Sequence, residues 1–277
     1  MNQTKNTESP SHYDHLEKKS VIELITGINK EDKTVAQIVK TCLPQIEKLI
    51  SAALPKMKTG GRLFYIGAGT SGRLGVLDAS EIPPTYGVSQ NIVIGIIAGG
   101  DNAIRNAVEY AEDDVNQAWE ALTAHQITDK DFLVGIAASG QTPYVLGGIR
   151  DAKAKGILTG CIVCNPGSAI AREADYPVEL TTGPEFVTGS TRMKAGTAQK
   201  MALNMISTTL MIQLGKVKGN KMIEMQLSNN KLWNRAVIML TQELGVSNTE
   251  GLALIKKHGS IKKAIKSYES KKLPLHK

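Results

Sequence analysis

The sequence predicts an α/β protein: a three-layer αβα sandwich around a five-stranded parallel sheet, followed by a small helical C-terminal appendage. The first observation is a series of apolar runs without polar alternation, which is typical of strands buried on both faces. These runs are residues 62–66, 92–98, 132–137, 158–163 and, more weakly, 176–180. The second observation is that helical segments separate the runs, as expected for parallel strands. These segments are residues 73–80, 102–124, 143–155 and 168–173.

The part of the chain before the sheet is predicted to be an arm and helices. Residues 1–19 are polar and form the arm, and Ser20 to Thr26 forms a short helix that Gly27 ends. Apolar residues at helical spacing continue from Val35 to Ile50. Pro44 predicts a kink or a boundary within that segment.

The part of the chain after the sheet is predicted to be helical. Residues 190–214 form a long buried helix that Ser190 or Thr191 can cap. Beyond Gly219 the composition changes, and three short helices are expected at 231–244, 247–257 and 260–268. The predicted organisation is therefore an N-terminal arm with helices (1–54), a phosphate-binding sheet domain (55–220) and a small helical domain (221–277).

Composition and charge exclude several classes of protein. The chain has 277 residues, 42% of them hydrophobic, which is enough for a sizeable core. Residues 251–277 carry eight lysines and one glutamate, which equals the whole net charge of +7. A solvated helical face explains that segment better than a nucleic-acid partner. Three cysteines, a polar N-terminus and no membrane-length apolar run indicate a cytoplasmic protein without disulfides or membrane contact.

A glycine-rich loop follows the first apolar run. It reads Gly-Ala-Gly-Thr-Ser-Gly-Arg over residues 67–73, between a strand and a helix. Free backbone N–H groups and the helix dipole bind phosphate at such a place. The loop also satisfies G-x-G-x-x-G, but the acidic residue that dinucleotide binding requires about 20 residues later is absent. The hydroxyls favour a phosphate monoester, held by Gly69, Thr70, Ser71 and Gly72; a tight turn without a ligand is the structural alternative.

A second loop of the same kind follows the third apolar run. Ala-Ala-Ser-Gly-Gln-Thr-Pro-Tyr at residues 137–144 again combines small residues, hydroxyls and a helix start. Two hydroxyl-rich loops at two strand ends are more specific than one, and together they can surround one sugar phosphate. We expect Ser139, Gly140 and Thr142 to take part.

Two groups of carboxylates are candidates for acid–base chemistry. Glu81 precedes Pro83 and Pro84 at the end of the first helix of the sheet domain, where the helix dipole disfavours a surface glutamate. Glu109 and Glu112 lie three residues apart and share a helical face. A solvated acidic face is the usual role of such a run, and the residues alone do not choose between Glu109 and Glu112.

The run of residues 183–200 places Arg192 and Lys194 at the start of a helix, where cations oppose the dipole. An anionic substrate would explain Lys194, and an ion-paired helix start is the alternative. Cys161 and Cys164 lie in an apolar strand and are interpreted as core residues. The five histidines are scattered, so no metal site is expected.

At these residues the chain resembles the N-acetylmuramic acid 6-phosphate etherase family, which belongs to the sugar isomerase (SIS) fold group and is related to the glucokinase regulatory protein. The resemblance covers about residues 20 to 245. The matching stretches are Gly67–Gly75, Asp78–Gly87, Ala98–Gly100, Ala137–Tyr144, Cys164–Ser168 and the highly specific run 183–200. The run 183–200 marks the etherase and regulator branch of the fold group.

The resemblance implies cleavage of the D-lactyl ether of N-acetylmuramic acid 6-phosphate, by elimination and then hydration, in amino-sugar recycling or catabolism. By position, Glu81 matches the proton donor of the family and Glu112 its second catalytic glutamate, the C2 base. Two carboxylates with separated pKa values suffice, so no metal or nicotinamide cofactor is implied. The family also implies a homodimer whose active site is completed across subunits.

Two other functions fit parts of the sequence. An aldose–ketose isomerase of the same fold needs a C2 base but no acid at C3, and the run 183–200 argues against it. A non-catalytic sugar-phosphate sensor needs the two loops but not both glutamates. Such a sensor normally has a DNA-reading domain or a second SIS unit, and 277 residues leave room for neither.

Overall fold

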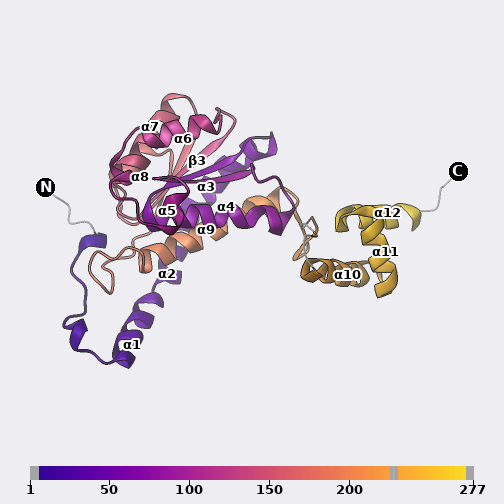
Figure 1. Ribbon diagram of the computed structural model, residues 1–277, viewed down its shortest axis with the longest axis horizontal. Helices are drawn as coiled ribbons and strands as arrows, with labels where there is room; N and C mark the ends of the chain where they lie inside the picture. The colour runs from indigo at the N-terminus through magenta and orange to yellow at the C-terminus, as the bar shows by residue number, and fades with distance from the viewer. Residues whose placement is uncertain (1–5, 225–226, 228–229, 273–277) are drawn as a thin grey trace. The chain divides into compact units, whose positions relative to one another are not determined.

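The computed structural model describes residues 6–224, 227 and 230–272 (Figure 1). The chain forms two compact units. The first comprises the residues up to Ser80 together with Asn91–Leu210, and the second comprises Glu81–Gln90 together with the residues from Met211 on. The boundaries at residues 55 and 221 remain a prediction from the sequence.

The first unit contains the predicted parallel sheet. Its strands are β1 (Leu63–Gly67), β2 (Val93–Ile97), β3 (Phe132–Ala137), β4 (Leu158–Val163) and β5 (Tyr176–Glu179). All are parallel, in the order β2-β1-β3-β4-β5. The order reverses between β1 and β3, and doubly wound sheets bind their ligands at such a switch point.

Helices cover both faces of the sheet, which confirms the predicted sandwich. They are α3 (Leu43–Lys58), α4 (Gly69–Tyr86), α6 (Gln117–Ala124), α7 (Pro143–Ala154), α8 (Ala169–Glu173) and α9 (Lys194–Gln213). In Figure 1, α6 and α7 lie on one side of the sheet, and α4 and α9 lie on the other. The core between the sheet and α7 is mainly aliphatic and includes Ile66, Leu133, Val145 and Ile149, all fully buried.

The predicted helix at 102–124 is wrong in its continuity. The segment contains α5 (Asn102–Arg105), the 3-10 helix η3 (Ala111–Asp113) and α6. Tyr110 breaks the helical pattern because its backbone is left-handed, with φ of 62°. Asp114 then starts α6 by accepting hydrogen bonds from the N–H groups of Asn116 and Gln117.

Gly27 does not end the first helix. The helix α1 (Val21–Asp32) starts at a capping box of Ser20 and Glu23 and continues through Gly27. A Cβ atom at Gly27 would lie 2.6 Å from the Phe186 ring, so glycine is needed there for close packing. Pro44 does mark a boundary, because it lies in the first turn of α3, after α2 (Val35–Thr41).

The second unit contains the three predicted C-terminal helices, α10 (Asn230–Leu244), α11 (Asn248–His258) and α12 (Ile261–Lys272). Their shared core includes Ala236, Leu240, Ile255 and Ala264. A short antiparallel pair, β6 (Val217–Lys218) and β7 (Lys221–Met222), precedes them. Across the described ranges, no helix combines the length and the apolar content needed to cross a membrane.

Candidate active site

The first phosphate-loop candidate forms the opening turn of α4. This helix begins at Gly69, directly after β1, so Gly69, Thr70, Ser71 and Gly72 all lie in its first turn. The first N–H groups of a helix have no partner within it and carry its positive dipole end. Gly72 packs so tightly that a Cβ atom there would lie 2.6 Å from the Gly67 carbonyl oxygen. The turn therefore suits an anion.

The second loop connects β3 to α7 and leaves the sheet beside the first. Because β1 and β3 are neighbouring parallel strands, both loops lie at the switch-point edge. Ser139 accepts a hydrogen bond from the Gln141 N–H (3.2 Å), and Gly140 has a left-handed backbone with φ of 65°. Thr142 stands at the start of α7 without using its side chain as a cap. The structure thus brings the two predicted loops together.

Glu112 lines a cavity beside the first loop. The cavity has a volume of about 180 Å³ and is lined by Ala68, Gly69, Arg73, Ala98, Ala103 and Ala107–Glu112. Arg73 supports its wall by donating hydrogen bonds to the carbonyls of Ile104 (3.0 Å) and Asn106 (3.3 Å). Both Glu109 and Glu112 line the cavity, so geometry alone does not separate them. A carboxylate base and a phosphate-binding turn share one space here.

Glu81 is exposed on α4, ten residues after Ser71. The helix does not end at the two prolines, as the sequence suggested, but continues through Pro83 and Pro84 to Tyr86. Glu81 belongs to the second unit, and its role as acid stays a prediction.

Asp78, which the sequence analysis did not single out, lies at a buried contact between α4 and α9. Its Oδ1 accepts a hydrogen bond from the Ser207 hydroxyl (3.0 Å). Burial raises the pKa of Asp78 to about 6, against the opposing effects of Ser207, Tyr65 and Lys200. Among the described residues, the buried Oδ2 of Asp78 and the Tyr65 hydroxyl have no hydrogen-bond partner of standard geometry. Nothing in the sequence pattern distinguishes this carboxylate from a surface one.

Lys194 is held in an ion pair at the start of α9. Its Nζ lies 2.6 Å from Oε2 of Glu31 on α1, and the two side chains are only 5% and 13% exposed. Glu185 caps the helix instead of Ser190 or Thr191, because its carboxylate accepts hydrogen bonds from the N–H groups of Lys194 and Ala195 (2.9 Å each). The ion pair accounts for the buried position of Lys194, and contact with substrate stays a prediction.

Ser71 has a buried partner that the sequence analysis also missed. The side chain of Ser71, a residue only 7% exposed, donates a hydrogen bond of 2.9 Å to Oε1 of Gln199 on α9. Gln199 lies in the run 183–200, and its position in that run was the only signal available from the sequence.

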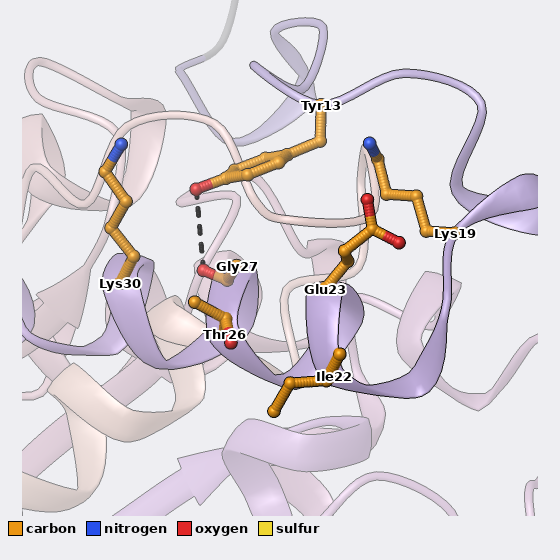
Figure 2. A pocket seen from close by; sticks show the side chains of 7 residues that line it. All are labelled: Tyr13, Lys19, Ile22, Glu23, Thr26, Gly27 and Lys30. Atoms are coloured by element: carbon orange, nitrogen blue, oxygen red, sulfur yellow. Dashed lines mark hydrogen bonds between the residues drawn. The ribbon is translucent and has the colours of Figure 1, made fainter.

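A second, larger cavity of about 330 Å³ lies beside α1 and contains none of the predicted site residues. It is lined by Tyr13, Lys19, Ile22, Glu23, Thr26, Gly27 and Lys30. Figure 2 shows Tyr13 over α1, with its hydroxyl directed at the Gly27 carbonyl (3.5 Å). The same hydroxyl donates to Glu31 (3.1 Å), which ties the N-terminal arm to the ion pair of Lys194.

The described part of the chain has no cluster of three His, Cys, Asp or Glu side chains arranged for a metal ion. Cys161 and Cys164 are free and buried, and burial raises the pKa of each thiol to about 12. A thiol with so high a pKa is a poor nucleophile and ligand, since the thiolate is the reactive form.

Comparisons with known proteins cover nearly the whole chain. An N-acetylmuramic acid 6-phosphate etherase of Christiangramia forsetii is 60% identical over 266 residues, which cover 96% of this chain and 97% of that protein. One from Bacteroides fragilis is 60% identical over 264 residues (95% and 94%), and one from Salmonella agona is 48% identical over 250 residues (90% and 84%). Family models also match: the glucokinase regulatory protein N-terminal SIS domain at residues 45–153 and the SIS domain at residues 113–209.

Solved structures confirm the SIS-type fold. A sugar-phosphate-fold protein from E. coli CFT073 has a TM-score of 0.55 at 17% identity and covers 72% of this chain and 94% of its own. A phosphoheptose isomerase from Neisseria gonorrhoeae has a TM-score of 0.53 at 15% identity, with coverage of 69% and 99%. At these identities the likeness concerns the fold alone.

Proposed function

The chain belongs to the N-acetylmuramic acid 6-phosphate etherase family, and we infer from this that it cleaves the D-lactyl ether at C3 of N-acetylmuramic acid 6-phosphate. The products are N-acetylglucosamine 6-phosphate and D-lactate. The chain is therefore a carbon–oxygen lyase of carbohydrate metabolism. We propose that it acts in the cytoplasm, as a homodimer, in recycling or catabolism of cell-wall amino sugars.

The 6-phosphate is proposed to bind at the switch point between β1 and β3. The opening turn of α4 supplies backbone N–H groups with Thr70 and Ser71, and the β3–α7 loop supplies Ser139 and Thr142. Their support is that neighbouring strands place both loops at one edge of the sheet. Lys194 is a weaker candidate for a contact to the phosphate or the lactyl carboxylate, since Glu31 already pairs with it.

Glu112 is proposed as the base and Glu81 as the acid. In the open-chain sugar, the C1 aldehyde acidifies the C2 hydrogen, and Glu112 takes this proton. The C3–O bond then breaks, and Glu81 protonates the departing ether oxygen, which leaves as D-lactate. Water adds at C3 of the unsaturated aldehyde, and its proton returns the sugar to N-acetylglucosamine 6-phosphate. The observation that carries the choice of Glu112 is the cavity that it shares with Gly69.

Lactate release from purified protein tests the function. We expect release by the unaltered protein and a loss of at least about a hundredfold in Glu112→Gln, the size typical of a lost acid–base group. Asp113→Asn is the matched control, because Asp113 is exposed on the same η3 but does not line the cavity. Saturable sugar-phosphate binding without any lactate release would instead support a sensor.

A further inference from the structure

The hydrogen bond between Ser71 and Gln199 runs in a direction that opposes phosphate binding. The Ser71 hydroxyl has a single proton, and it gives that proton to Oε1 of Gln199. A phosphate oxygen accepts hydrogen bonds and, as a dianion, donates none. Ser71 can therefore serve the phosphate only if its proton leaves Gln199.

Gln199 itself has an unused donor. Its side chain is fully buried, and its Nε2 has no hydrogen-bond partner among the described residues. A buried amide N–H without a partner costs free energy and calls for an explanation. Gly196, three residues earlier on α9, contacts Thr70, since a Cβ atom there would lie 3.4 Å from the Thr70 methyl. The start of α9 therefore braces both hydroxyl residues of the loop.

We propose that Gln199 is a positioning residue for the phosphate and that its amide inverts when Ser71 binds the phosphate. After inversion, Nε2 donates to the Ser71 oxygen, and the Ser71 proton goes to a phosphate oxygen. The rotation needed is about the terminal side-chain torsion of glutamine, which is broad and roughly two-fold. This inference rests on the proposed function, specifically on Ser71 as a phosphate contact.

The inverted arrangement is favoured electrostatically. Two hydrogen bonds then run in series from the amide through the hydroxyl to the anion, and bonds aligned in this way polarise one another. The positive end of the amide dipole also points toward the phosphate. The same rotation satisfies the buried Nε2 and leaves an unpaired carbonyl oxygen, which is less costly than an unpaired N–H.

Two substitutions at Gln199 separate orientation from packing. Gln199→Glu keeps the shape but can only accept when ionised, so it holds the Ser71 proton and repels the phosphate. Gln199→Met keeps the length and leaves the hydroxyl unoriented. We expect KM for the sugar phosphate to rise about tenfold or more in Gln199→Glu and by less in Gln199→Met, with kcat changed less than KM in both.

The matched control is Ser207→Ala, which removes another buried hydrogen bond of α9 that does not involve the loop. It should lower the unfolding temperature without changing KM. In a Ser71→Ala background, Gln199→Met should raise KM no further, because the hydroxyl that Gln199 orients is already gone.

Several results would overturn the inversion. They are an unchanged KM in Gln199→Glu, an equal rise in Ser207→Ala, or a full further rise when Gln199→Met is added to Ser71→Ala. If Gln199→Glu does not fold, Gln199→Met and the double variant decide the question alone. Failure of the proposed function is distinct, because the unaltered protein would then release no lactate.

Discussion

Asp78 shows how far a side chain's surroundings can alter its chemistry. The sequence places it three residues before Glu81, and both are carboxylates of one helix. Glu81 is exposed, whereas Asp78 is largely buried against Tyr65 and Ser207, and burial raises its pKa to about 6. Three residues along a helix are enough to move a side chain from solvent to an interface, and a sequence pattern without depth cannot show which carboxylate is buried.

The raised pKa of Asp78 predicts that part of the protein's stability falls as pH rises. Between about pH 4 and 6 the folded protein holds a proton on Asp78 that the unfolded chain has released, so unfolding becomes easier as pH increases. The loss is at most about 3 kcal/mol, at about 1.4 kcal/mol for each pKa unit. Above pH 6 the contribution is constant.

Asp78→Asn should remove this dependence, because asparagine does not ionise and can still accept from Ser207. Urea unfolding at pH 4.5 and 7.5 measures it in both proteins, and the difference between them cancels the other titrating groups. Equal pH dependence in the two proteins would show that Asp78 ionises normally.

At the scale of elements, the structure explains the specific run 183–200 as the support of the phosphate loop. Glu185 places a negative charge at the N-terminus of α9, which the helix dipole favours. Further along, Gln199 and Ser207 bond to Ser71 and Asp78. The run therefore fixes α9 against the start of α4.

Lys194→Met predicts a loss of stability rather than of chemistry. Removing the cation leaves the carboxylate of Glu31 unpaired in a mostly buried place, which costs about 3–5 kcal/mol. Adding Glu31→Gln should restore much of that stability. Chemical unfolding measures both effects.

The double variant also decides the substrate role of Lys194. With stability restored, normal KM and kcat for lactate release would make Lys194 a structural residue. A raised KM that persists in the double variant would mean that the lysine also contacts substrate.

At the scale of the whole molecule, the sequence predicted most of the sheet and less of what connects it. Strands β3 and β4 match their predicted limits, because buried parallel strands form uninterrupted apolar runs. The helix at 102–124 failed at Tyr110, whose left-handed backbone no propensity predicts. Gly27 failed because its role is set by Phe186, which is distant in the sequence.

The candidate site was predictable where it depends on local chemistry. Glycines and hydroxyls at two strand ends indicated the loops, and the strand order brought them together. Gln199 and Glu185 were not predictable, because their partners are set by how α9 packs in three dimensions. Long-range side-chain pairs leave no periodic signal along the chain.

A homodimer with shared sites predicts recovery of activity from two inactive variants. If each site takes Glu81 from one subunit and Glu112 from the other, a mixed dimer of Glu81→Gln and Glu112→Gln has one intact site. Dimers formed at random after joint refolding should then show about a quarter of the unaltered activity. Sedimentation checks the dimer itself, and no recovery from mixed dimers would place both glutamates of a site in one subunit.

The assignment of Glu112 as the C2 base is tested most directly by hydrogen exchange in deuterated water. Sugar phosphate is incubated with each variant, and deuterium at C2 is measured beside D-lactate. Glu81→Gln should retain exchange while losing lactate release, since it lacks only the acid. Glu112→Gln should lose both. Exchange at the unaltered rate in Glu112→Gln would contradict the assignment and move the base to another residue.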